Sequence, residues 1–279
     1  MCDYTLYAAL IPALGILIIG LMAGFVGTFA FLKKQTMLGD TIAHAALPGI
    51  CGAFLFTNNG SSMVLIFGGF IAGLCAVALV TILQHYTHIG SDAILGTILS
   101  VFFGLGLVLL THIQKLPIAA QAVLNKFLFG SAATLLYEDL LLLTIVGCIV
   151  CVTLFCIWHP LVIVLFDQRY AHTIGMPVWV ILTLFYILLV LVIVAGLYAV
   201  GVVLMSSLLV APAVAARALT RSVQHMAFCA AAWGACAGML GMLWSLSAAH
   251  LPTGPAIVIV ATGGTLLVLA AGLARRSVA

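Results

Sequence analysis

Long apolar runs separated by short polar breaks make up most of the chain. A helix needs about 20 apolar residues to cross the hydrocarbon core of a bilayer, and most of the runs approach or exceed that length. Dividing the chain at charges, Pro/Gly clusters and amide-rich turns predicts nine membrane-spanning helices. They cover residues 7–31, 38–56, 63–83, 93–113, 140–165, 178–196, 198–216, 226–246 and 256–273.

Two regions of this pattern are ambiguous. Residues 178–216 are almost uninterrupted, so we expect two spans joined by a tight turn near Gly196, Tyr198 and Gly201, although a single long span would leave eight in total. The segment 114–139 is too polar and broken to span the membrane, yet it contains short apolar stretches. We expect it to form a short helix that lies at the outer surface or dips back into the bilayer.

Composition supports a membrane protein. Hydrophobic residues make up 66% of the 279 positions and charged residues 5%, whereas a globular domain carries roughly a quarter charged residues. Six acids and nine bases cannot cover the surface of a soluble protein of this size. We therefore predict an all-α integral membrane protein, a polytopic helical bundle with one transmembrane domain over residues 1–279.

Several function classes are disfavoured by what the sequence lacks. It contains no GxxxxGK[ST] loop, so nucleotide hydrolysis would require another polypeptide. The HExxH and GxSxG motifs are also missing, which argues against an intramembrane hydrolase. The net charge of +3 is scattered without a Lys/Arg run, so nucleic acid is not an expected partner.

The basic residues predict an orientation. If the N-terminus lies outside, seven of the nine fall on the cytoplasmic side and only Lys115 and Lys126 lie outside. Nine spans then place the C-terminus in the cytoplasm. The seven are Lys33, Lys34, Arg169, Arg217, Arg221, Arg275 and Arg276.

Asp40 and His44 are the strongest candidates for chemistry. They lie four residues apart at the start of the second span, so a helix would place the carboxylate and the imidazole on one face. An ionised Asp inside a span costs roughly 2.5–3.5 kcal/mol and normally faces a cavity or a partner. Oxygen and nitrogen ligands together suit manganese, iron or zinc. A structural alternative is that Asp40 caps the helix and His44 pairs with it.

A second group of ionisable residues lies between the third and fourth spans. His85, His88 and Asp92 are close enough in sequence to suggest a metal cluster, but they fall in a polar turn. Because the turn is expected to lie in the cytoplasm, a solvated loop is the favoured interpretation, and the metal cluster is the alternative.

The run LGDTIAHAALPG, residues 38–49, resembles the LGD-x-x-SHA-x-LPG signature of permeases from ABC importers of manganese, zinc and iron. It departs from that signature at Ala43, where the family usually has Ser. Further segments resemble the same family in the same order along nearly the whole chain. They are LFGS at 128–131, FD at 166–167 with Ala171 and Gly175, VG at 200–201, LLVAPA at 208–213 and TGP at 253–255.

The resemblance implies a function and partners. The chain would be the permease subunit, with the fold of type II ABC importer permeases, in the bacterial cytoplasmic membrane. A separate cytoplasmic ATPase, an extracytoplasmic metal-binding protein and a second permease chain, identical or paralogous, would complete it within membrane lipid. No cofactor would be bound permanently, because Mn²⁺, Zn²⁺ or Fe²⁺ is the cargo. An ATP-independent secondary metal transporter or channel is the alternative.

The resemblance also assigns a role to the loop between the fifth and sixth spans. In the family this loop is a short coupling helix that docks in a cleft of the ATPase, and the charge count places it in the cytoplasm here. Without the resemblance, an ordinary turn between helices would explain it. The expected contact residues are Gln168, Arg169, Tyr170, Ala171, His172, Thr173, Ile174 and Gly175.

Overall fold

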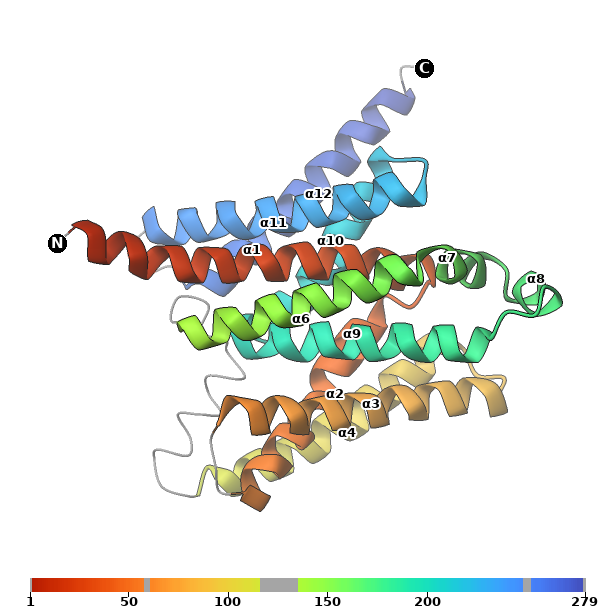
Figure 1. Ribbon diagram of the computed structural model, residues 1–279, viewed down its shortest axis with the longest axis horizontal. Coiled ribbons are helices and arrows are strands. Elements are labelled where there is room, and N and C mark those ends of the chain that lie inside the picture. The colour runs from red at the N-terminus through yellow and green to blue at the C-terminus, as the bar shows by residue number, and fades with distance from the viewer. Residues whose placement is uncertain (1, 58–60, 116–134, 248–251, 278–279) are drawn as a thin grey trace.

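The computed structural model describes residues 2–57, 61–115, 135–247 and 252–277, and all regular structure in them is helical (Figure 1). Nine of these helices are long and apolar enough to cross a membrane. The nine are α1 (Cys2–Leu32), α2 (Met37–Thr57), α3 (Ser62–Tyr86), α4 (Ser91–Ile113), α6 (Tyr137–Cys156), α9 (Val178–Val200), α10 (Val202–Leu219), α11 (Val223–Ser247) and α12 (Thr253–Ser277). Two shorter helices, α7 (Trp158–Phe166) and α8 (Gln168–Thr173), lie between α6 and α9.

The predicted all-helical fold with nine spans is confirmed within the described residues, but the fifth span is wrong as a single helix. It is interrupted at Ile157, where α6 ends and α7 begins. The physical reason is Pro160, whose ring clashes with the carbonyl of Cys156 four residues earlier and which has no N–H to donate to it. The expected surface segment at 114–139 falls mostly outside the described residues, and α6 starts at Tyr137.

The turn between α9 and α10 is confirmed, although it falls later than the predicted split. Gly201 alone separates the two helices, with φ of 86° and ψ of 170°. This region of backbone conformation is open almost only to glycine. The reversal can therefore be completed in one residue, and α9 runs to Val200.

Small residues allow α1 and α11 to pack with their backbones in contact. A Cβ atom added to Gly20 would lie 2.5 Å from the carbonyl oxygen of Gly234, and one added to Gly24 would lie 2.3 Å from that of Ala230. Close backbone approach strengthens helix association in a bilayer, where apolar side chains gain little by leaving lipid. These two helices form a rigid edge of the bundle.

α2 and α9 are the most buried of the nine spans, yet they differ in polarity. The mean hydropathy is 1.3 for α2 and 3.1 for α9. α2 runs obliquely through the bundle (Figure 1) and packs mainly against α3 and α4. At Gly49, a Cβ atom would lie 2.2 Å from the carbonyl oxygen of Gly68 in α3. The least hydrophobic span thus occupies a central position, shielded from lipid by its neighbours.

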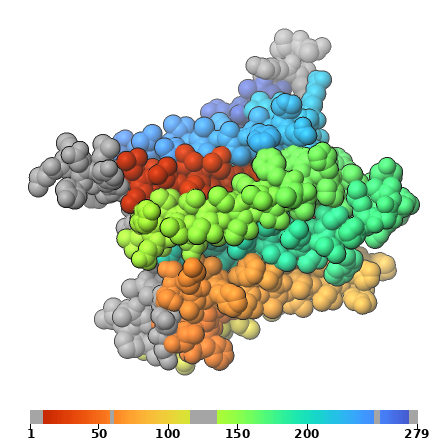
Figure 2. Space-filling model, viewed as in Figure 1, coloured from red at the N-terminus to blue at the C-terminus, as the bar shows by residue number. Residues whose placement is uncertain are grey.

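An aromatic cluster holds the break between α6 and α7 against α1. The ring centroid of Trp158 lies 5.1 Å from that of Phe29 and 5.8 Å from that of Phe25. Beyond this cluster α8 projects from the end of the bundle (Figures 1 and 2). The end of α1, the end of α10 and the turn between α10 and α11 lie at the same end (Figure 1). These segments carry Lys33, Lys34, Arg217 and Arg221.

Candidate functional site

Asp40 and His44 lie on one face of the first turns of α2. The Oδ1 atom of Asp40 is 3.6 Å from Nε2 of His44. Two ligands of a tetrahedral ion with bonds of about 2.1 Å are about 3.4 Å apart, so the observed separation fits a shared ion after a small adjustment. The Asp40 carboxylate also lies in the first turn of its helix, where the positive end of the helix dipole stabilises a negative charge.

The surroundings fix this face while leaving it accessible. The His44 ring meets Phe103 of α4 edge to face, with ring centroids 4.8 Å apart. On the neighbouring faces, a Cβ atom added to Gly39 would lie 2.4 Å from Cδ2 of Leu209. The side chains of His44 and Asp40 nevertheless remain 26% and 45% exposed in the single chain. The pair is held in place by packing and remains open on one side.

Pro48 lies inside α2, which continues through it without a break. Because proline has no N–H, the carbonyl of His44, four residues earlier, loses its usual helical donor. Helix carbonyls point toward the C-terminal end and side chains lean toward the N-terminal end, so this oxygen lies on the side of His44 away from Asp40. The groups that face each other and can bind a divalent metal ion are the Asp40 carboxylate and the His44 imidazole.

Other candidate positions contribute no ligand to this pair. Ala43 is 1% exposed and packs in the interior of the bundle, so this position does not face the open side of the pair. Among the described residues, no three His, Cys, Asp or Glu side chains gather as a metal cluster. His85, His88 and Asp92 do not come together as such a group.

The predicted coupling segment is a short helix with a defined beginning and end. Asp167 caps α8 by accepting a hydrogen bond at Oδ1 from the backbone N–H of Tyr170, with an N···O distance of 3.0 Å. Gly175, with φ of 76°, ends it, and the N–H of Met176 donates to the carbonyl of Ala171 at 3.0 Å. The other expected contact residues are exposed, while Ala171 is fully buried and anchors the segment.

A hydrogen-bonded group at the same end of the bundle was not predicted from the sequence. Lys33 donates to the hydroxyl of Tyr186, which donates to Oε1 of Gln35 at 3.2 Å, and Nε2 of Gln35 donates to Oε1 of Gln84 at 3.2 Å. These residues come from three separate parts of the chain: the segment after α1, the last turns of α3, and α9. Polar residues at the ends of apolar runs were the only sequence signal, and such residues are common at membrane surfaces.

A second unpredicted group lies at the opposite end of the bundle. The hydroxyl of Tyr198 donates to Oδ1 of Asp139 at 2.7 Å, and it lies 2.6 Å from Oγ of Ser62. Asp139 is 5% exposed and also accepts a bond from the backbone N–H of Leu136 at 3.1 Å. These contacts tie the ends of α3, α6 and α9 together and account for a buried carboxylate.

The fold and site describe a polytopic membrane protein that carries its central polar groups on one oblique helix. The chain belongs to the ABC 3 transport family, whose family model matches residues 4–272. It is 40% identical over 273 residues to the zinc transport system membrane protein TroC of Treponema pallidum, covering 98% of this chain and 91% of that protein. It is 36% identical to the manganese transport system membrane protein MntC of Bacillus subtilis, covering 89% of this chain and 57% of that protein.

Solved structures share the fold. The structure of PsaBC from Streptococcus pneumoniae in complex with Fab aligns with a TM-score of 0.78 and 29% identity, covering 92% of this chain and 89% of that one. A putative metal-chelate type ABC transporter in an inward-facing conformation aligns with a TM-score of 0.73 at 18% identity, a similarity of fold alone. The predicted resemblance to ABC importer permeases is confirmed.

Proposed function

We propose that the chain is the translocation subunit of an ATP-driven importer that moves a divalent transition metal into the bacterial cytoplasm. The observation that carries the proposal is the Asp40–His44 pair, partly exposed on the least hydrophobic span, which is also one of the two most buried, in a member of this family. Ionisable side chains inside membrane spans usually serve ion pathways because their burial is costly. The subunit performs no covalent chemistry, and a separate subunit hydrolyses ATP.

Asp40 and His44 would bind the ion transiently. Two protein ligands from one helix leave coordination positions open, which water or the equivalent face of a second permease chain would fill. An incomplete set of protein ligands favours release, because water can replace each contact in turn. Weak, exchangeable ligation suits transport better than tight storage, since an ion that binds too strongly cannot leave.

The cargo is a transition metal of the manganese, iron and zinc group. Mixed carboxylate and imidazole ligation suits all three. Relatives are named as zinc, manganese and chelated iron transport system membrane proteins, which supports the same group here. An extracytoplasmic metal-binding protein would deliver the ion at the end of the bundle opposite α8.

α8 would transmit the movement of the ATPase to the bundle. Its exposed residues project beyond the spans, and its buried Ala171 ties it to the helices behind it. The basic loops at the same end support a cytoplasmic position under the positive-inside rule, with the N-terminus outside. Rigid-body rocking of helices around a fixed site would then alternate access between the two sides.

Reconstitution tests the motor dependence of this proposal. The permease with its ATPase, in liposomes loaded with a metal-sensing dye, should take up Mn²⁺ or Zn²⁺ only when ATP and the delivery protein are supplied. A matched complex whose ATPase cannot hydrolyse ATP should show background uptake. If the permease alone moved metal at the full rate, the chain would be an ATP-independent transporter or channel.

Cysteine crosslinking tests the coupling helix separately. A cysteine placed at exposed Thr173 of α8 should crosslink to the ATPase, whereas one placed at exposed Phe56, near the other end of the bundle, should not. Labelling of the Thr173 cysteine by a membrane-impermeant reagent added outside intact cells would contradict the proposed orientation.

A further inference from the structure

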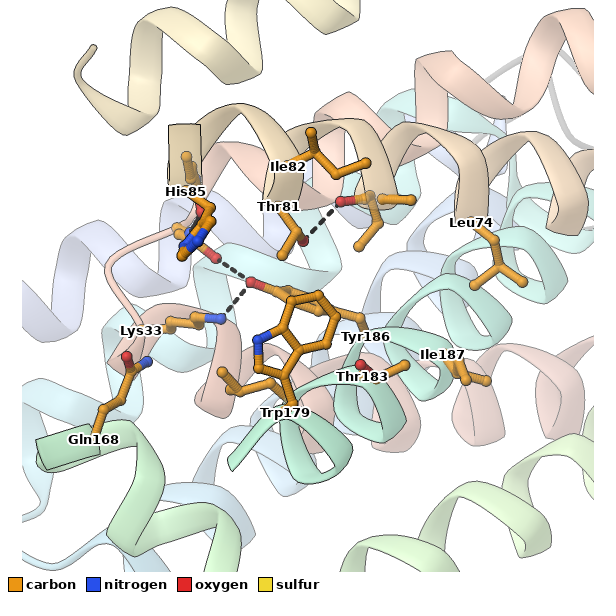
Figure 3. A pocket seen from close by; sticks show the side chains of 15 residues that line it. Lys33, Leu74, Thr81, Ile82, His85, Gln168, Trp179, Thr183, Tyr186 and Ile187 are labelled. Carbon is orange, nitrogen blue, oxygen red and sulfur yellow. Dashed lines mark hydrogen bonds between the residues drawn. The ribbon is translucent and has the colours of Figure 1, made fainter. Parts of the chain in front are cut away.

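A pocket of about 580 Å³ lies between α3 and α9, at the end of the bundle from which α8 projects (Figure 3). Its polar groups come from the last turns of α3, the segment after α1 and the start of α8. Trp179, 68% exposed in the first turn of α9, stands at its rim. Aromatic residues at this position are typical of the membrane–water interface. The mouth of the pocket is therefore at the depth of lipid headgroups.

Lys33 supplies donors without acceptors at the polar end. Its ammonium group has three N–H bonds and shares one with the hydroxyl of Tyr186, over whose ring its Nζ lies 4.1 Å from the centroid. The remaining N–H bonds of Lys33 are available to a ligand in the pocket.

The charge of Lys33 is also uncompensated in the part of the chain that the structure describes. No carboxylate there forms an ion pair with its ammonium group, whose contacts are to a neutral phenol. Burial lowers the pKa of Lys33 from its ordinary 10.5 to about 8, so the group still carries its charge at neutral pH. An anion within reach would stabilise that charged form and satisfy the remaining donors.

The other end of the pocket is apolar. Along α3, the lining changes from Gln84 and His85 in the last turns to aliphatic side chains in the earlier turns, and α9 adds further aliphatic side chains. Leu74 and Ile187 lie at the end away from His85 (Figure 3), and Val77, Ala78 and Leu182 add further aliphatic lining. A ligand that matches both ends has an anionic head and a hydrocarbon tail.

We propose that this pocket binds an anionic phospholipid of the cytoplasmic leaflet, with its phosphate at Lys33 and an acyl chain between α3 and α9. A metal cation is disfavoured by the ammonium group, and a soluble anion would leave the apolar walls unused. Basic pockets between transmembrane helices are known to hold such headgroups.

The position of the pocket connects it to α8. Gln168, the first residue of α8, also lines it, so a bound headgroup lies beside the segment that we propose docks the ATPase. Lipid binding itself does not depend on that proposed role. It can therefore be measured on the full-length permease without its ATPase.

The experiment is a lipid titration of the purified permease followed by native mass spectrometry, with phosphatidylglycerol and phosphatidylcholine of identical acyl chains. Wild type should bind phosphatidylglycerol about tenfold more tightly, because one charge-assisted contact favours the anionic head. Lys33→Met should abolish this preference, whereas Lys34→Met, which removes the neighbouring exposed charge, should retain it.

A steric pair of variants tests the apolar half without touching Lys33. Ala78→Phe fills the pocket and should weaken binding of both lipids, while Ala232→Phe, at an exposed position of α11, should not. Equal binding of the two lipids by wild type, a preference that survives Lys33→Met, or unchanged binding to Ala78→Phe would overturn the proposal. Displacement of the lipid by inorganic phosphate would instead assign a headgroup-only anion site, and displacement by the ATPase would assign a protein contact.

Discussion

α2 and α9 are equally central in the bundle and chemically opposite. Both bury the same share of their most apolar stretch, 67%, but α9 is the most hydrophobic span and α2 the least. α9 fills space with aliphatic side chains such as Leu189 and Val190, both fully buried. α2 instead carries small residues, a proline and an ionisable pair. Burial alone therefore does not distinguish α2, which carries the candidate site, from α9, whereas burial combined with low hydropathy does.

Removing either Asp40 or His44 should give the largest effect, a loss of transport in a permease that still folds. In Asp40→Ala and His44→Ala variants assembled with the ATPase, we expect metal uptake to fall by at least about 100-fold, because each removes a ligand. Both side chains are partly exposed, so thermal unfolding of the purified permease should be nearly unchanged. Normal uptake by either variant would refute the ligand assignment.

A side chain that forces α2 away from α3 should lower stability strongly. Gly49→Val places a side chain where a Cβ atom alone meets the carbonyl of Gly68 at 2.2 Å, and we expect destabilisation of about 3 kcal/mol. Gly52→Val is a matched control on the same helix, since a Cβ atom there meets nothing within 4 Å. Unfolding in mixed micelles would measure both, and equal stabilities would contradict the close approach of α2 and α3.

A cavity in α9 should lower stability without lowering uptake, which is the reverse of the result expected for the Asp40 and His44 variants. Leu189→Ala removes a fully buried side chain, and lost packing should cost about 2 kcal/mol of stability. Uptake per folded molecule should be retained, because Leu189 offers no ligand. Leu267→Ala, at a position of α12 that is 72% exposed, is the control and should have little effect. A specific loss of uptake in Leu189→Ala at normal stability would show that α9 takes part in the pathway.

The smallest expected effect is the pH dependence of stability that Lys33 causes. Lys33 contacts α9 through the hydroxyl of Tyr186. Burial lowers its pKa to about 8, so the folded state disfavours the charged form that the unfolded chain holds up to about pH 10. Stability should therefore rise with pH, by about 1 kcal/mol between pH 7 and 9. His85 lines the same pocket, and Tyr186 is the other titratable contact.

The control for this dependence is the Lys33→Met variant, in which the rise in stability between pH 7 and 9 should be missing. An anionic lipid in the pocket should reduce the rise in wild type, because a nearby negative charge returns the pKa of Lys33 toward its ordinary value. Identical pH profiles of wild type and Lys33→Met would show that Lys33 does not lose its proton in this range.

The sequence by itself determined the number and approximate positions of the spans and the candidate pair. Both depend on local properties: the length of an apolar run, and the spacing of Asp40 and His44 by one helical turn. The short helix between the fifth and sixth spans was expected only from the family resemblance, and its Asp167 cap was seen in the structure. The break at Ile157 was also encoded locally, in Pro160, but the apolar run concealed it.

Only the tertiary structure decided which helix is central and which side chains from distant segments meet. In a span that is apolar all around, no periodic pattern distinguishes the face that meets lipid from the face that meets another helix. The contacts among Lys33, Gln84 and Tyr186 therefore had no signature in the sequence. They arise because backbone packing at small residues sets the positions of the helices, and those positions bring the ends of α1, α3 and α9 together.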